Sequence, residues 1–191
     1  MSRPSAELTR LEDIGRAFYA GKISRDEARS AVIDVIFDRL RCSRVSLWRF
    51  DGEAGDRSLL CFAAKAAGAG LDVTERRLRE PEYRDYFDAL VNNGMFVSVD
   101  AVADPLLQPM SERYLIANGV RSLLDAAFLV NGRAYGMVCC EQTDTIRRWR
   151  VDEIAALRAM VSKLALLMAV AADKALWNSP SLPMTPLPLS A

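Results

Sequence analysis

The stretch RSLLDAAFLVNGRAYGMVCCEQ, residues 121–142, decides the fold predicted for this chain. Two apolar runs flank Asn131-Gly132, a dipeptide that tolerates positive φ and is a strong signal for a β-hairpin. Both runs are apolar at nearly every position, so both faces of the sheet must be covered. Asp125 interrupts the first run, and burying a carboxylate is costly unless it has a partner. We therefore expect Asp125 to be either hydrogen-bonded structure or a wall of a binding site.

Two registers are compatible with this hairpin, and a shift of one residue between them exchanges the two faces of the strands. A two-residue turn places Asp125 opposite Val138. A three-residue loop with a left-handed glycine places Arg121 opposite Glu141 instead. Because the second register pairs opposite charges across the strands, a gain of a few tenths to ~1 kcal/mol, we favour it.

Length and charge suit one globular domain with short appendages. The chain has 191 residues, with 25 Lys and Arg against 25 Asp and Glu, so no net charge attracts nucleic acid or an anionic membrane. The first residues lack the apolar core of a signal peptide. No stretch approaches the roughly 18 consecutive apolar residues of a membrane span. We expect a cytoplasmic protein without nucleic-acid or membrane partners.

Histidine is absent from the sequence. This excludes Ser-His and Cys-His nucleophile pairs, histidine ligands to metals or haem, and the usual general base near neutral pH. The cysteines, at 42, 61, 139 and 140, show no CxxC spacing. Adjacent Cys139 and Cys140 point to opposite faces of one strand, so a shared metal or a mutual disulfide is disfavoured. We interpret them as buried thiols and predict no metal site.

Periodicity and capping signals define the remaining elements. They predict helices at residues 6–20, 24–41, 82–93 and 111–117, and strands at residues 44–51, 58–67 and 96–99. Residues 68–81 read as a mobile loop or a poorly regular edge, with solvated arginines rather than a phosphate site. No crossover helix separates the first two strands or the last two. The fold class is therefore α+β, with a central, mainly antiparallel sheet.

A long helix follows Asp152-Glu153, whose charges favour a helix N-terminus. Its apolar residues keep spacings of three and four, at Ile154, Leu157, Val161, Leu164, Met168 and Ala171. Met160 and Leu167 form a second line, so one line can cover the sheet while the other meets another chain. We assign residues 1–23 to an N-terminal helix that could take part in dimerisation, residues 24–176 to the domain, and residues 177–191 to a proline-rich tail expected to be disordered.

Five segments together resemble a GAF domain in their order and spacing. They are RVSLWRFD (44–51), YRDYFDAL (83–90), VSVDAVADP (97–105), the stretch 113–142 and RRWRVDEIAALR (147–158). The resemblance spans residues 24–170. It implies a GAF/PAS-like sheet of about six strands, with the terminal helices on one face and loops and short helices around a ligand pocket on the other. It also implies a small-molecule ligand, of unknown identity here, and a homodimer that relays occupancy through the terminal helices.

The resemblance implies the pocket residues position by position. The wall would include Trp48, Tyr114, Leu123, Asp125, Cys139 and Glu141, and the lid would include Tyr86, Phe87, Phe96 and Asp100. This set fits the three-residue register, with Ser122, Leu124, Ala126, Phe128, Val138 and Cys140 packed under the terminal helices. The competing interpretation is structural: the aromatic side chains fill the core, and the carboxylate of Glu141 pairs with Arg121 at the end of the sheet.

Two branches of the family fit poorly. Its bilin-binding members use a histidine beside the chromophore, and this chain has none. Its cyclic-nucleotide signature is present only in degraded form, as Gln142-Thr143, Trp149 and Asp152-Glu153. The sequence therefore predicts a non-enzymatic sensory domain that passes its signal to a separate protein. The first alternative is a ligand-free dimerisation or interaction module. The second is a free-methionine-sulfoxide reductase of GAF fold that uses cysteine thiols.

Overall fold

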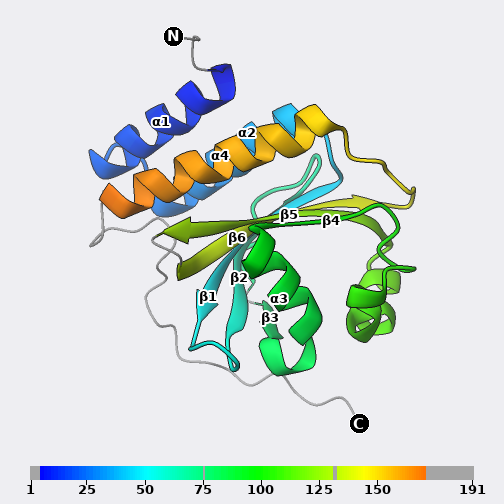
Figure 1. Ribbon diagram of the computed structural model, residues 1–191. Coiled ribbons are helices and arrows are strands. Elements are labelled where there is room, and N and C mark those ends of the chain that lie inside the picture. Colours follow the sequence, from blue (N-terminus) through cyan, green and yellow to red (C-terminus); the bar gives the residue numbers. More distant parts are fainter. Residues whose placement is uncertain (1–4, 75, 131–132, 171–191) are drawn as a thin grey trace.

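Six antiparallel strands form one sheet in the order β3-β2-β1-β6-β5-β4, in a computed structural model that describes residues 5–74, 76–130 and 133–170 (Figure 1). The strands are β1 (Arg44–Asp51), β2 (Ser58–Ala66), β3 (Arg76–Arg79), β4 (Met95–Ser98), β5 (Val120–Val130) and β6 (Arg133–Thr143). The three strands predicted outside the hairpin are confirmed to within one residue. The segment expected to be a loop or irregular edge contributes β3, a short edge strand whose exposed arginines discourage further pairing.

Helices cover both faces of the sheet (Figure 1). On one face lie α1 (Ala6–Tyr19), α2 (Arg25–Leu40) and α4 (Val151–Val170); on the other lie α3 (Arg84–Asn93) and the short helices η1 (Glu80–Glu82), η2 (Pro105–Met110) and η3 (Ser111–Ile116). The predicted α+β class and layer arrangement are confirmed. The capping box that begins α2 is also present, since the backbone N–H of Glu27 donates to Ser24 Oγ and the N–H of Ser24 donates to the Glu27 carboxylate.

The central hairpin adopts neither predicted register along its length. Next to residues 131–132, which lie outside the described residues, Val130 faces Arg133 as a two-residue turn requires. An irregularity at Phe128/Leu129 then shifts the pairing, so that Asp125 lies opposite Cys139. The favoured register was wrong by two residues. Because a shift of two preserves the alternation of side chains, the predicted division of the hairpin between its two faces is nevertheless correct.

The register of the hairpin also separates Arg121 from Glu141, so the predicted ion pair between them is absent from the described residues. Leu123 lies opposite Glu141, which pairs with Arg44 on the neighbouring strand β1. Arg121 pairs instead with Asp100, at 3.6 Å between guanidinium and carboxylate.

Both apolar lines of α4 are covered by the same chain. In the first line, Val161 is buried beside β5 and Leu164 is buried against Leu11 of α1. In the second line, Met160 is fully buried and Leu167 packs against Gly15 of α1. The N-terminal helix therefore occupies the place that the sequence suggested for a second chain, although the last two positions of the seam, 168 and 171, lie outside the described side chains. None of the described helices has the length and apolar character needed to cross a membrane.

Candidate functional site

A row of polar and aromatic side chains runs across the sheet on the face covered by α3 and the short helices. Strand pairing aligns Phe96 of β4 with Asp125 of β5, Asp125 with Cys139 of β6, and Cys139 with Ser46 of β1. Directly opposed residues on neighbouring strands share a face and lie in contact. Pairing and alternation thus bring together residues far apart in the chain.

Asp125 is the centre of this row. Its side chain is fully buried, and the Tyr86 hydroxyl from α3 donates a 2.7 Å hydrogen bond to its Oδ2. Burial raises the pKa of Asp125 to about 7, against the lowering effects of the Cys139 thiol and the Tyr86 hydroxyl; the charge of Glu141 raises it further. Buried Oδ1 makes no regular hydrogen bond among the described residues, and the Cys139 thiol beside the carboxyl is a weak donor. Burying an oxygen without a regular hydrogen-bond partner costs free energy.

Glu141 is the contrasting carboxylate, because both of its oxygens have partners. Arg44 pairs with Oε2, and the Tyr114 hydroxyl from η3 donates a 2.5 Å hydrogen bond to Oε1. Burial, followed by the charge of Glu141, raises the pKa of Tyr114 well above its ordinary value, so it stays a donor. Glu141 therefore ties the sheet to η3, while Asp125 keeps one oxygen available.

Aromatic rings fill the space around these carboxylates. The Tyr86 ring meets Phe96 and Phe87 edge-on, with centroids 5.1 Å and 6.0 Å apart, and Trp48 donates to Ser46 Oγ at 2.8 Å. All of them are buried. This face is therefore a packed core, as the structural interpretation of the aromatic residues expects.

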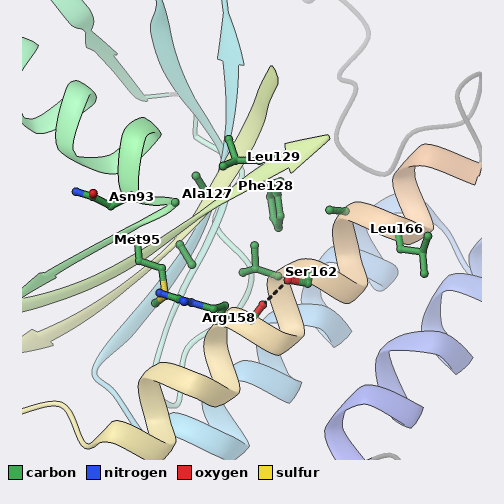
Figure 2. A pocket seen from close by; sticks show the side chains of 12 residues that line it. Asn93, Met95, Ala127, Phe128, Leu129, Arg158, Ser162 and Leu166 are labelled. Atoms are coloured by element: carbon green, nitrogen blue, oxygen red, sulfur yellow. Dashed lines mark hydrogen bonds between the residues drawn. The ribbon is translucent and has the colours of Figure 1, made fainter. Parts of the chain in front are cut away.

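Nine of the ten predicted site residues lie in this cluster or at its margin, and Asp100 pairs with Arg121 away from it. The ion pair of Glu141 with Arg44 was not predicted from the sequence. Alternation along residues 44–51 places Arg44 on the face of Trp48, but only the strand order shows that β1 lies beside β6. A groove of about 620 Å³ between α4 and the edge of the sheet at β5 was not predicted either (Figure 2).

The family model of the GAF domain matches residues 24–168. The chain belongs to the GAF domain family. Among curated protein sequences, none matches it significantly. No group of three or more His, Cys, Asp or Glu side chains suited to a metal ion occurs in the described part of this GAF domain.

Solved GAF domains from photoreceptors share the fold. The phycocyanobilin-bound GAF domain of a cyanobacterial phytochrome is similar with a TM-score of 0.68 and 17% identity, over 88% of this chain and 97% of that one. The far-red absorbing dark state of JSC1_58120g3 with bound biliverdin gives 0.66 and 14%, over 87% and 99%. The blue-light absorbing form of the Thermosynechococcus elongatus PixJ GAF domain gives 0.62 and 18%, over 87% and 91%. At these identities the likeness shows the fold alone.

Proposed function

We propose that this GAF domain senses a small organic ligand on the face that carries Asp125. The observation behind the proposal is the buried Oδ1 of Asp125, which has no hydrogen-bond partner among the described residues. A ligand hydroxyl or amine that donates to this oxygen would satisfy it and remove its desolvation cost. The same ligand would stack against Tyr86 and Phe96, whose rings already pack beside the carboxylate.

Entry of a ligand requires this packed face to open. The segment that covers it from residue 105 to residue 116 is a 3-10 helix that contains Pro109, followed by one turn with π-helical bonding. Such short, irregular elements hold fewer backbone bonds than an α-helix and open at a lower free energy. We infer that η2 and η3 move outward, that Tyr114 leaves Glu141, and that the sheet passes the change to the terminal helices.

A homodimer remains part of this proposal, with its surface revised. Leu157, Val161 and Leu164 of the predicted seam are buried within the chain. A second copy would therefore contact the exposed side of the helical layer rather than this seam. A separate signalling protein is the expected receiver of the change.

Ligand binding is tested by native mass spectrometry of the purified protein and by thermal shifts against a metabolite panel. A ligand at a hundred times its Kd stabilises by ~2.7 kcal/mol, or roughly 5–10 °C for a domain of this size. Asp125→Asn should reduce the shift, while Asp51→Asn, at an exposed site, should leave it unchanged. If no compound co-purifies and none raises the melting temperature, the ligand-free interaction module becomes the better interpretation, because it needs no opening of the packed face.

The reductase alternative has less support. Burial raises the pKa of the Cys139 thiol well above its ordinary value, and the neighbouring carboxylates raise it further. A nucleophilic cysteine needs the opposite shift. Thiol-dependent reduction of free methionine sulfoxide that is lost in Cys139→Ser would restore this alternative.

A further inference from the structure

Strand β5 extends beyond its edge neighbour β4. Pairing with β4 ends where Met95 faces Ala126, and the next contact is the 2.9 Å bond from Ala127 N–H to the carbonyl of Gly94. β5 continues to Val130, and no described strand pairs with its outer edge there. Leu129 and Val130 lie beyond the last backbone bond between β5 and the residues of β4 and its approach. An open edge of this kind is a template for another extended segment.

A groove of about 620 Å³ lies between this edge and α4 (Figure 2). Its lining is mostly apolar and includes Met95, Phe128, Val161, Ala165 and Leu166. Leu129 is 40% exposed and Leu166 58% exposed, so the groove and its rim present apolar surface to solvent. A groove with exposed leucines at its rim is a candidate surface for another segment.

The polar groups of the groove are few. Arg158 Nε donates to the thioether sulfur of Met95 at 3.2 Å, a weak acceptor, and Ser162 donates to the carbonyl of Arg158 within the helix (Figure 2). Asn93 lies at the end near β4. The lining contains one charged side chain, the exposed Arg158, and its remaining surface can accept an uncharged segment with apolar side chains.

We propose that residues 177–191 of the same chain, WNSPSLPMTPLPLSA, dock in this groove. The segment has no charged residue, and its apolar side chains are Trp177, Leu182, Met184, Leu187 and Leu189. Prolines at 180, 183, 186 and 188 have no backbone N–H to satisfy on an apolar surface. They also restrict the undocked chain, so less entropy is lost on docking.

The place where the described part of α4 ends supports residues 177–191 as the segment that fills the groove. α4 and β5 run side by side in the same direction, and Leu166 of the groove lies about one turn before Val170, where the described part of α4 ends (Figure 1). A segment that leaves there and folds back would run antiparallel to β5, which is the direction of β4. It would enter the lane that β4 leaves open beside Leu129. From Arg158 to Leu166 the groove spans only ~12 Å of α4, which a few extended residues cover.

Two-dimensional ¹⁵N–¹H NMR of the full chain and of a chain ending at residue 176 tests the proposal. We expect truncation to shift the amide signals of Met95, Leu129 and Arg158, and a synthetic peptide of residues 177–191 to restore them with saturation. A control peptide with serine at positions 182, 184, 187 and 189 should have no effect. In the full chain, Leu166→Asp should move the Met95 and Leu129 signals as truncation does. Ile116→Asp, at an exposed apolar residue of η3, should not.

Three results would overturn the proposal. Truncation could leave the three signals in place, or the control peptide could act as well as the native one. The shifts could also depend on protein concentration while sedimentation velocity reports a dimer, which would assign the groove to a second copy. The test is independent of ligand binding at Asp125, since the groove lies on the other face of the sheet.

Discussion

Asp125→Asn should remove the effect of pH on stability that the buried carboxyl produces. The folded protein holds the Asp125 proton up to about pH 7, whereas the unfolded chain releases it near the ordinary pKa of 3.8. Between these values only the unfolded state is ionised, so stability falls as pH rises from about 4 through about 7 and is then constant. A difference of about three pKa units corresponds to ~4 kcal/mol at the plateau, since each unit is worth 1.36 kcal/mol. The uncharged amide has no such dependence.

Urea denaturation of both proteins at about pH 5 and about pH 8.5 measures this difference directly. Because roughly two of the three units fall between these pH values, the stability of Asp125→Asn relative to wild type should rise by about 2–3 kcal/mol from the lower to the higher pH. Asp51→Asn, at an exposed residue, makes the same charge change without burial and serves as the control. Tyr86→Phe should extend the fall of stability with pH to higher pH, because the Tyr86 hydroxyl lowers the pKa of Asp125 in the folded protein. A constant difference between wild type and Asp125→Asn across both pH values would refute the raised pKa.

Three further predictions concern stability. Ser24→Ala should lower the free energy of unfolding, measured by urea denaturation, by ~1 kcal/mol because the capping-box bond to Glu27 is lost. Ser5→Ala should have no measurable effect, because the Ser5 side chain makes no cap bond. Equal losses would contradict the capping account. Glu80→Gln should lower the free energy of unfolding by about 1–2 kcal/mol near neutral pH and by less near pH 3. Arg57 holds the pKa of Glu80 at about 2, so the stability that this carboxylate contributes is lost as pH falls from about 4.5 through about 2. A loss independent of pH would contradict this account. Leu11→Ala should lower the free energy of unfolding by ~2–4 kcal/mol and leave one cooperative transition, because Leu11 is fully buried in the core shared with α2 and α4. A loss below ~1 kcal/mol, or a separate early transition, would show that α1 is an appendage.

Local signals in the sequence were sufficient for most of the elements. Strand β1 has the predicted bounds, and the capping box places the start of α2 correctly, because both depend on neighbouring residues in the chain. The hairpin register failed because an irregularity between Phe128 and Leu129 has no residue signature of its own. The faces survived because side-chain direction repeats every two residues.

The candidate site was predictable in composition and less so in its contacts. Asp125 was identified because a carboxylate inside an apolar run needs an explanation, and the structure gives it a partner in Tyr86. The pairing of Glu141 with Arg44 depends on the strand order, which no local pattern encodes. Likewise, the periodicity of α4 showed two apolar lines without showing that α1 covers one of them. Long-range partners of this kind follow from topology alone.

The raised pKa of Asp125 also bears on the kind of ligand that this face would select. Near neutral pH the carboxyl is close to half ionised, so binding and protonation are linked. A cationic ligand prefers the ionised form and would bind more tightly as pH rises through about 7. A ligand that accepts a hydrogen bond prefers the protonated form and would bind more tightly as pH falls. Because the pKa of Asp125 is about 7, a change in the packing of Tyr86 against Asp125 alters the ionised fraction near neutral pH. The affinities for the two ligand classes then change in opposite directions. The buried acid at the centre of the hairpin is thus the residue through which lid position, proton and ligand would be coupled.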